Sequence, residues 1–93
     1  MPFVYILCCG DGSLYTGCAK DMDRRLAQHR AGRASRYTRS RLPVTLAWTR
    51  RVRSWSRALE EERRIKALTR AQKQILVLSG RRQRPAGYEE RER

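Results

Sequence analysis

The hydrophobic and polar positions divide the chain into short elements. Residues 3–9 are apolar, β-branched or aromatic without interruption, which predicts a buried strand. The sequence Gly-Asp-Gly-Ser at 10–13 is typical of a turn, and residues 14–18 predict a second strand, so the two runs should form a β-hairpin. A third strand is predicted at 44–49, after the helix-breaking Pro43.

Capping residues and apolar spacing predict helices between and after these strands. Asp21 can cap a first helix that runs to about Arg30, and residues 31–41 form a loop or a short helix. Ser54 can cap a long helix that reaches Leu68.

The C-terminal part predicts one more helix, followed by a polar tail. Thr69 and Gln72 match a capping box, and the helix that they start should end near Gly80. Residues 81–93 are polar and aperiodic, which predicts a disordered tail after a single domain at 1–80. The order β-β-α-β-α-α predicts an α+β fold in which helices cover a small sheet.

The charge of the chain indicates a polyanionic partner. Its 93 residues include 22 Lys and Arg against 9 Asp and Glu, a formal net charge of +13. Nucleic acid is the leading candidate. A membrane surface is the weaker one, because the longest apolar run, at 2–9, is far too short to span a bilayer. We therefore predict a nucleic-acid partner and no membrane partner.

The three cysteines predict neither a metal site nor a disulfide framework. Cys8, Cys9 and Cys18 form no C-x-x-C pair and have no metal-ligand spacing. Their odd number, with the lack of a secretory signal, favours the reducing cytoplasm, where they would pack as small apolar residues on the strands.

Two polar side chains fall on a helix face that should turn toward the sheet. At 100° per residue, Arg25 and His29 share a face with Met22 and Leu26, whereas Arg24 points elsewhere. A snorkelling arginine and a hydrogen-bonded core histidine would explain each residue alone. Together they also fit the mouth of a cleft that holds an anion.

The long helix carries a carboxylate in a similar position. Its predicted apolar stripe consists of Trp55, Ala58, Leu59 and Ile65. Glu62 lies near the middle of that stripe, Glu60 and Glu61 lie on other faces, and Lys66 follows Glu62 by four residues. An i, i+4 ion pair is one explanation, and the binding of a cation is the other.

The hairpin adds two tyrosines and a glycine. Tyr5 and Tyr15 alone would be core aromatics, and Gly17 lets another group approach the backbone closely. The chain has no H-x-H ligand set and no nucleophile elbow, which argues against a two-metal nuclease site and against serine hydrolysis. One glutamate, one arginine, one histidine and two tyrosines remain, a set that suits phosphodiester hydrolysis with a single divalent metal.

These residues, taken in order, resemble the GIY-YIG nuclease domain, in particular its small single-domain bacterial branch. The resemblance covers about residues 3–78 and rests on F-V-Y at 3–5, Y-T-G at 15–17, A-K-D-M-D-R-R-L-A-Q-H, R-Y-T-R-S-R-L-P-V-T-L-A-W and A-L-E-E-E-R-R-I-K. Phe-Val replaces Gly-Ile in the first motif and Thr replaces Ile in the second. Neither change removes a polar reacting group.

The resemblance implies a three-stranded antiparallel sheet flanked by helices, and metal-dependent cleavage of DNA with one Mg²⁺ or Mn²⁺ ion. It implies that Glu62 is the metal ligand. The catalytic positions that it implies are Tyr5, Tyr15, Arg25 and His29. The substrate contacts that we expect around them are Gly17, which would leave room for the substrate backbone, Arg36, Arg39 and Lys66.

Three functions stay open from the sequence. The first is a divalent-metal-dependent DNA endonuclease, with branched or damaged DNA as candidate substrates. The second is a non-catalytic nucleic-acid-binding module whose site residues are remnants. The third is a subunit that needs another protein to present its substrate. The presence of all five polar residues favours the endonuclease.

Overall fold

The computed structural model describes residues 1–83, with the side chains of residues 1–80. Its core is a three-stranded antiparallel sheet in the strand order β2-β1-β3. The strands are β1 (Phe3–Cys8), β2 (Leu14–Ala19) and β3 (Thr45–Arg51), and the helices are α1 (Met22–Arg30), α2 (Arg36–Arg39), α3 (Trp55–Lys66) and α4 (Arg70–Gln83). The predicted α+β fold is confirmed, and the segment at 31–41 supplies the additional short helix α2.

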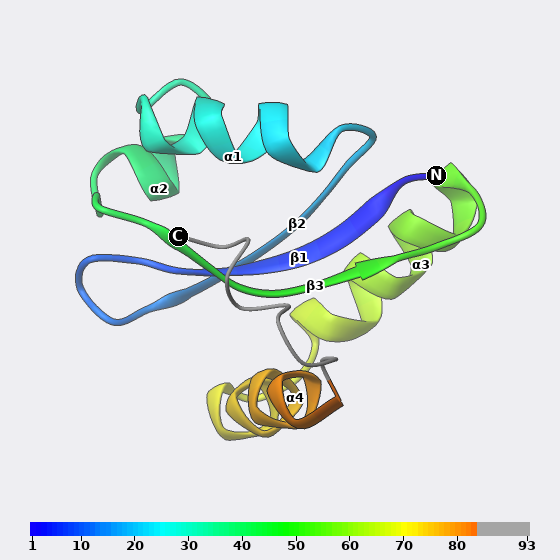
Figure 1. Ribbon diagram of the computed structural model, residues 1–93. Coiled ribbons are helices and arrows are strands. Elements are labelled where there is room, and N and C mark those ends of the chain that lie inside the picture. Colours follow the sequence, from blue (N-terminus) through cyan, green and yellow to red (C-terminus); the bar gives the residue numbers. More distant parts are fainter. Residues whose placement is uncertain (84–93) are drawn as a thin grey trace.

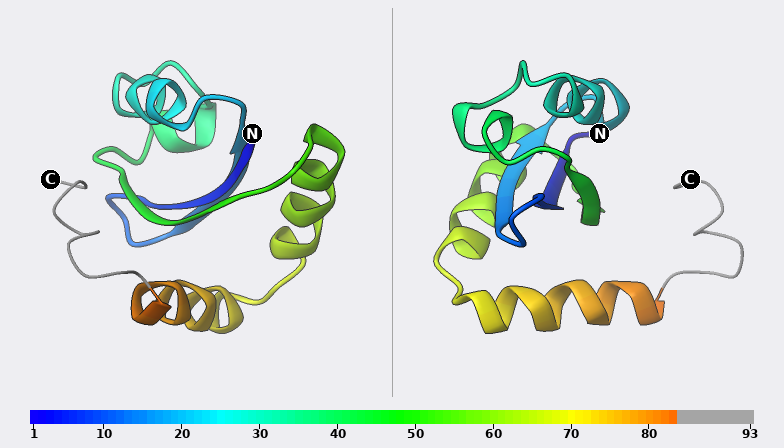
Figure 2. Two further views of the ribbon diagram at one scale, coloured as in Figure 1. Left: turned by 45° about the vertical axis from the view of Figure 1, so that its right-hand side comes forward. Right: turned by 90° about the vertical axis from the view of Figure 1, so that its left-hand side faces the viewer.

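Helices cover both faces of the sheet, and this explains the continuous apolar run of β1. Figure 1 shows α1 and α2 on one side of the sheet and α3 and α4 on the other, and Figure 2 shows the same layers from two further directions. Val4, Tyr5, Ile6 and Leu7 are each at most 2% exposed, because β1 is the central strand and alternate residues face opposite layers. Val4 and Ile6 pack toward α3 and α4, whereas Tyr5 and Leu7 pack toward α1.

The predicted helix caps are present. The side chains of Asp21 and Ser54 each accept a hydrogen bond from the backbone N–H three residues later. Thr69 and Gln72 form a reciprocal capping box, with distances of 2.9 Å from Thr69 N to Gln72 Oε1 and 3.2 Å from Gln72 N to Thr69 Oγ1. Local side-chain chemistry therefore sets where these helices start.

Some predicted boundaries differ from the structure by one to three residues. The first strand ends at Cys8, the third continues to Arg51, and α3 ends at Lys66. Helix α4 continues to Gln83, so the predicted tail began three residues too early, and the remainder of that tail, 84–93, lies outside the described residues. Within the described part of the chain, no helix combines the length and apolarity that crossing a bilayer requires.

The predicted apolar stripe of α3 is only half correct. Ala58 and Ile65 are fully buried against the sheet, but Trp55 and Leu59 are 39% and 38% exposed. The expectation that all four are buried is wrong, because α3 contacts β2 and β1 through its Ala58–Ile65 side alone. Two large apolar side chains are therefore left on the outer flank of the helix.

Candidate active site

A buried hydrogen-bond chain joins three elements on the α1 side of the sheet. The Tyr5 hydroxyl, from β1, lies 2.8 Å from His29 Nε2, and His29 Nδ1, from α1, lies 2.8 Å from Thr38 Oγ1. Thr38 belongs to α2, whose cap residue Ser35 has its Oγ 2.9 Å from Thr38 Oγ1. The three members of the chain are 2%, 1% and 0% exposed, respectively. The inward face predicted for His29 therefore leads to two specific hydrogen bonds.

The same chain fixes which histidine nitrogen carries the proton. The Thr38 hydroxyl can donate to the Ser35 carbonyl, at 3.4 Å, and so accept from His29 Nδ1–H. His29 Nε2 is then free to accept the Tyr5 proton. In the opposite tautomer the buried Tyr5 proton would have no acceptor, since the hydroxyl makes no other hydrogen bond within the described residues. We therefore assign the proton to Nδ1.

Gly17 makes room for Tyr5. The two residues pair across β1 and β2, and a Cβ on Gly17 would lie 2.6 Å from the Tyr5 hydroxyl oxygen. The phenol ring therefore occupies the space that glycine provides. The structure gives this space to Tyr5, whereas the sequence analysis expected it to receive the substrate backbone.

A row of rings leads from His29 to the surface. The Tyr15 ring centroid lies 5.3 Å from that of His29 and 5.8 Å from that of Tyr37, on which it stacks. The Arg41 guanidinium carbon lies 3.8 Å from the centroid of the Tyr37 ring. The sequence analysis missed Tyr37 and Thr38. The only signal for them was their place in R-Y-T-R, where we considered the arginines alone.

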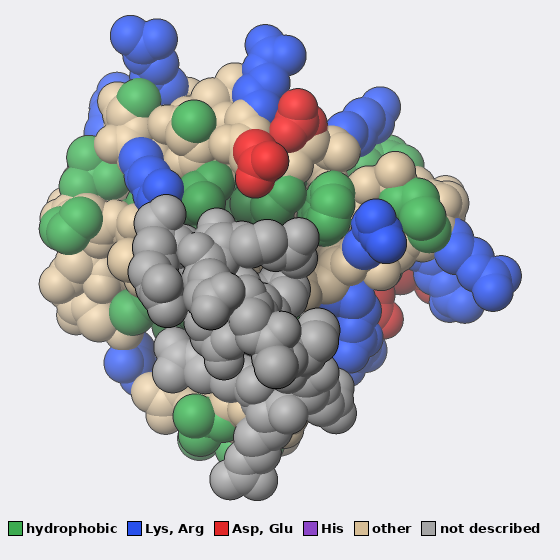
Figure 3. Space-filling model, in the orientation of Figure 1, with side chains coloured by type: hydrophobic (Ala, Val, Ile, Leu, Met, Phe, Trp, Pro, Cys, Tyr) green, Lys and Arg blue, Asp and Glu red, His purple; other side chains and the backbone are tan. Residues whose placement is uncertain are grey.

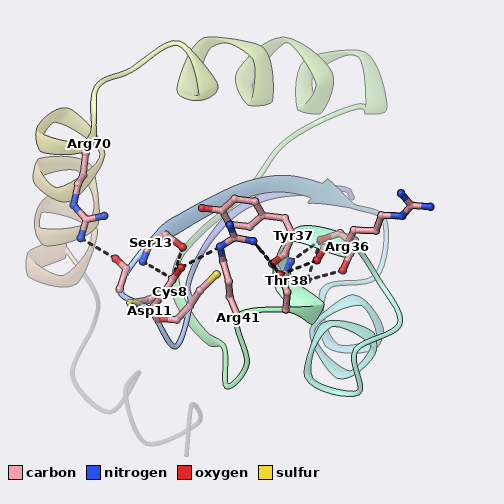
Figure 4. Close-up of polar contacts among 12 residues, drawn as sticks. Cys8, Asp11, Ser13, Arg36, Tyr37, Thr38, Arg41 and Arg70 are labelled. Carbon is pink, nitrogen blue, oxygen red and sulfur yellow. Dashed lines mark hydrogen bonds and ion pairs between the residues drawn. The ribbon is translucent and has the colours of Figure 1, made fainter.

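The hairpin turn is connected to the Tyr37 end of this row through Arg41, as Figure 4 shows. Arg41 Nε lies 3.0 Å from Asp11 Oδ2, and Arg41 Nη1 donates to the Tyr37 carbonyl at 3.0 Å. From the other side, Arg70 Nη2 of α4 donates to the Gly12 carbonyl at 2.8 Å. Arg41 is thus engaged within the protein. The two arginines of α2, Arg36 and Arg39, are exposed and form no ion pair among the described residues.

The candidate metal ligand Glu62 lies at the β2 edge of the sheet. Its Oε1 accepts a hydrogen bond from Cys18 Sγ at 3.2 Å, and its Oε2 lies 3.0 Å from Lys66 Nζ. Burial, with the neighbouring carboxylate, raises the pKa of Cys18 to about 11, so the thiol keeps its proton and donates it. Cys18 was expected to pack as a small apolar residue, and its hydrogen bond is a polar role that spacing could not indicate.

The Arg25 guanidinium connects the two groups of residues electrostatically. Burial lowers the pKa of His29, and the Arg25 charge lowers it further. Burial raises the pKa of Tyr5 well above its ordinary value, with a contribution from Tyr15, and Arg25 opposes this without cancelling it. Glu62 also raises the pKa of Tyr5. The charges of Arg25 and Glu62 therefore both lie within electrostatic range of the Tyr5 hydroxyl.

This region offers a divalent metal one carboxylate ligand, that of Glu62. Within the described residues, no three His, Cys, Asp or Glu side chains gather as a ready-made cluster. Mg²⁺ is commonly held by one or two carboxylates, with water and substrate phosphate as its other ligands, so the single Glu62 carboxylate suffices. The Lys66 ammonium now occupies one of its oxygens and would have to move aside.

Exposed cationic side chains are numerous on one face of the domain. Figure 3 shows blue Lys and Arg side chains spread around the rim of one face, with only small red areas. The chain has a formal net charge of +13, and the exposed cationic side chains of this face can contact phosphate groups.

Several known proteins are similar to this chain in sequence. Residues 1–75 match the family model described as the GIY-YIG catalytic domain. A UPF0213 protein of Halobacterium salinarum is 50% identical over 76 residues, which cover 82% of this chain and 99% of that protein. One from Staphylococcus epidermidis is 45% identical over 78 residues, 84% of this chain and 95% of that protein.

Two solution NMR structures are similar as well. The UPF0213 protein of Bacillus halodurans has a TM-score of 0.55 and 43% identity, with 86% of this chain and 87% of that chain covered. A protein of E. faecalis has a TM-score of 0.59 and 32% identity, with 92% of each chain covered.

Proposed function

The chain belongs to the GIY-YIG family, a nuclease superfamily, and from this premise we propose that it is a divalent-metal-dependent endonuclease that hydrolyses phosphodiester bonds in DNA. The observation that carries the proposal is the buried Tyr5–His29 hydrogen bond, beside Arg25 and near Glu62. Family membership supports nuclease chemistry and a DNA substrate in general. Branched or damaged DNA remains the proposed substrate class.

The Tyr5–His29 pair would accept the proton of the attacking water. Tyr5 is a neutral phenol at pH 7, so it cannot act as a base unless it gives up its own proton. His29 Nε2 is placed to take that proton as the phenol oxygen takes one from water. Thr38 holds the other ring nitrogen through its Nδ1 proton, which keeps Nε2 available. Tyr15, beside the imidazole, would orient the water.

Arg25 would bind the scissile phosphate, because a guanidinium forms paired hydrogen bonds with phosphate oxygens and offsets the charge that develops on them. Glu62 would hold Mg²⁺ or Mn²⁺, which when bound polarises the phosphate and stabilises the leaving oxygen. Release of Lys66 from Glu62 would free its ammonium for the same phosphate.

The Glu62–Lys66 ion pair also favours a second candidate, a nucleic-acid-binding module without catalysis, since in the free protein the carboxylate is already occupied. A cleavage assay separates the two candidates. Supercoiled plasmid, branched DNA and gapped duplex are incubated with Mg²⁺, Mn²⁺ or EDTA, and a Glu62→Ala sample purified identically controls for contaminating nuclease. Metal-dependent cuts that the variant does not make support the endonuclease. Binding of these DNAs without cuts under every metal supports the module.

A further inference from the structure

The N-terminal end of α3 borders a hollow of about 390 Å³ that is separate from the tyrosines. The side chains that define it are Lys20, Arg24, Arg25, Gln28 and Trp55. We propose that this hollow is a subsite for the base of a nucleotide that neighbours the scissile phosphate, with the base unstacked from its strand and lying against Trp55. The inference rests on the proposed function, since it gives that nuclease a way to select its substrate.

Of the two exposed aromatic side chains among the described residues, Tyr37 already contacts the Tyr15 ring and the Arg41 guanidinium, and Trp55 is the other. It is 39% exposed, whereas the other tryptophan, Trp48, is 4% exposed and packs in the core. Its ring does not serve the apolar contact between α3 and the sheet, which Ala58 and Ile65 make. An exposed indole in a strongly basic protein offers a stacking surface, and every nucleobase has a π-face that can use it.

The charges of the hollow suit the phosphates on either side of such a base. Three of the seven residues that line the hollow are cationic, and Lys20 Nζ lies 5.4 Å from the centroid of the Trp55 ring. The one carboxylate in the lining, Asp21, accepts the hydrogen bond from Arg24 N that caps α1. The hollow is therefore positively charged around an apolar surface. Phosphate alone would need no apolar surface, so the combination favours a whole nucleotide.

Position links the hollow to the chemistry. Arg25 forms part of its wall and also acts on the pKa values of Tyr5 and His29. Arg25 would therefore connect a base in the hollow with a phosphate near the reacting groups. The half-buried Gln28 side chain makes no hydrogen bond within the described residues, so its amide is available to the edge of a base. A volume of a few hundred Å³ is in the range of small-ligand sites.

The test measures binding in EDTA, so that it does not depend on cleavage. Three fluorescent duplexes of the same sequence are compared by polarisation: fully paired, with one bulged nucleotide, and with an abasic residue in the bulge. The parent should bind the bulged base on the order of tenfold more tightly than the abasic bulge. Trp55→Ala should bind these two equally, and Trp55→Phe should recover part of the difference. Leu59→Ala, an equally exposed apolar residue outside the hollow, should keep the full difference.

The outcomes separate this subsite from the nuclease itself. Equal binding of the base and the abasic bulge by the parent, or an undiminished preference in Trp55→Ala, overturns the subsite and leaves the endonuclease standing. If Trp55→Ala and Leu59→Ala lose the preference for the bulged base equally, the loss reflects a general effect on α3, and the subsite is overturned as well. Failure of the parent to bind any of the three duplexes in EDTA would overturn the subsite, and the cleavage assay with metal would decide the endonuclease separately. Tighter binding of the fully paired duplex than of either bulged duplex would show that the protein recognises an intact double helix, and would also exclude the subsite.

Discussion

The Tyr5 hydroxyl oxygen and His29 Nε2 lie 2.8 Å apart in a part of the protein from which water is nearly excluded. The contact joins the central strand to α1 and brings together two residues that are 24 positions apart. Because both are buried, the same bond contributes to folding and to the proposed proton transfer, and substitutions can separate the two contributions.

Tyr5→Phe removes the donor and leaves a buried imidazole nitrogen without its partner. We expect a loss of about 1–3 kcal/mol in the free energy of unfolding, measured by urea denaturation. Cleavage should fall by about 10²- to 10⁴-fold, the usual contribution of a positioned acid or base. Tyr15→Phe is the control for folding, because the Tyr15 hydroxyl makes no hydrogen bond within the described residues, and its stability should match that of the parent. Full activity in Tyr5→Phe would exclude the proton relay.

Thr38→Val tests the assignment of the histidine tautomer. The substitution removes the group that accepts from Nδ1–H, so the imidazole can adopt the tautomer that places its proton on Nε2. We expect cleavage to fall by about 10²-fold, with unchanged DNA affinity. The nitrogen chemical shifts of Nδ1 and Nε2 in the single histidine should be interchanged relative to those of the parent. Thr38→Ser retains a hydroxyl and should restore both readouts, whereas nitrogen shifts of the parent that place the proton on Nε2 would contradict the assignment.

His29 should also make the stability of the protein depend on pH between about 5 and 7. Burial, and then Arg25, lower its pKa below the ordinary 6.5. The folded protein therefore binds fewer protons than the unfolded chain once the pH drops below about 6.5. The stability that neutral His29 contributes is complete above that pH and is lost as the pH falls through the folded-state pKa. The melting temperature should decline between pH 7 and 5 in the parent and much less in His29→Gln, measured by calorimetry.

The same residues show what the sequence could and could not predict. The 3.6-residue period placed Arg25 and His29 on the inward face of α1, and capping chemistry placed the helix starts, because both depend on neighbours within one turn. Thr38 was missed because its partner lies nine residues away, across a loop whose path depends on tertiary contacts. Cys18 was missed because its partner Glu62 is 44 residues away.

Periodicity also could not tell how far α3 overlaps the sheet. The spacing of Trp55 and Leu59 is the same whether a helix lies over the centre of a sheet or across its edge, and only the packing of α3 decides between them. The exposure of these two side chains contradicts the predicted stripe, and one of them, Trp55, lines the same hollow as Arg25.

Arg36 and Arg39 should supply phosphate contacts that do not depend on sequence. They are exposed on α2 beside the row of rings. Changing either to Gln should weaken binding of all duplexes alike, and should reduce the slope of log affinity against log salt by about 0.9. Arg41→Gln is the contrasting variant, because it breaks contacts with Asp11 and Tyr37 and should lower the melting temperature instead. Unchanged slopes in the first two variants would remove α2 from the interface.

Glu62→Ala should abolish metal-dependent cleavage while DNA binding stays intact or becomes slightly tighter. The substitution removes the proposed metal anchor, and it also removes a negative charge from a basic surface that meets phosphate. Glu61→Ala is the matched control one residue away. Glu61 pairs with Arg50 and Arg64 at the surface, so its loss should cost at most about 1 kcal/mol of stability and should leave cleavage unchanged. Equal cleavage by the two variants in Mg²⁺ would exclude Glu62 as the metal ligand.

Lys66→Gln tests the same assignment in the opposite direction. In the free protein the Lys66 ammonium lies 3.0 Å from Glu62 Oε2, and this contact raises the pKa of Lys66, so lysine and metal compete for one carboxylate. Removing the positive charge should increase the affinity for Mn²⁺ several-fold, measured by titration calorimetry without DNA. Cleavage at saturating metal should nevertheless fall, because the released ammonium is the proposed partner of the phosphate. If Mn²⁺ affinity does not change in Lys66→Gln but disappears in Glu62→Ala, Lys66 does not compete for the metal. If the Mn²⁺ affinity changes in neither variant, the metal binds elsewhere in the protein, and Lys66 does not compete with it.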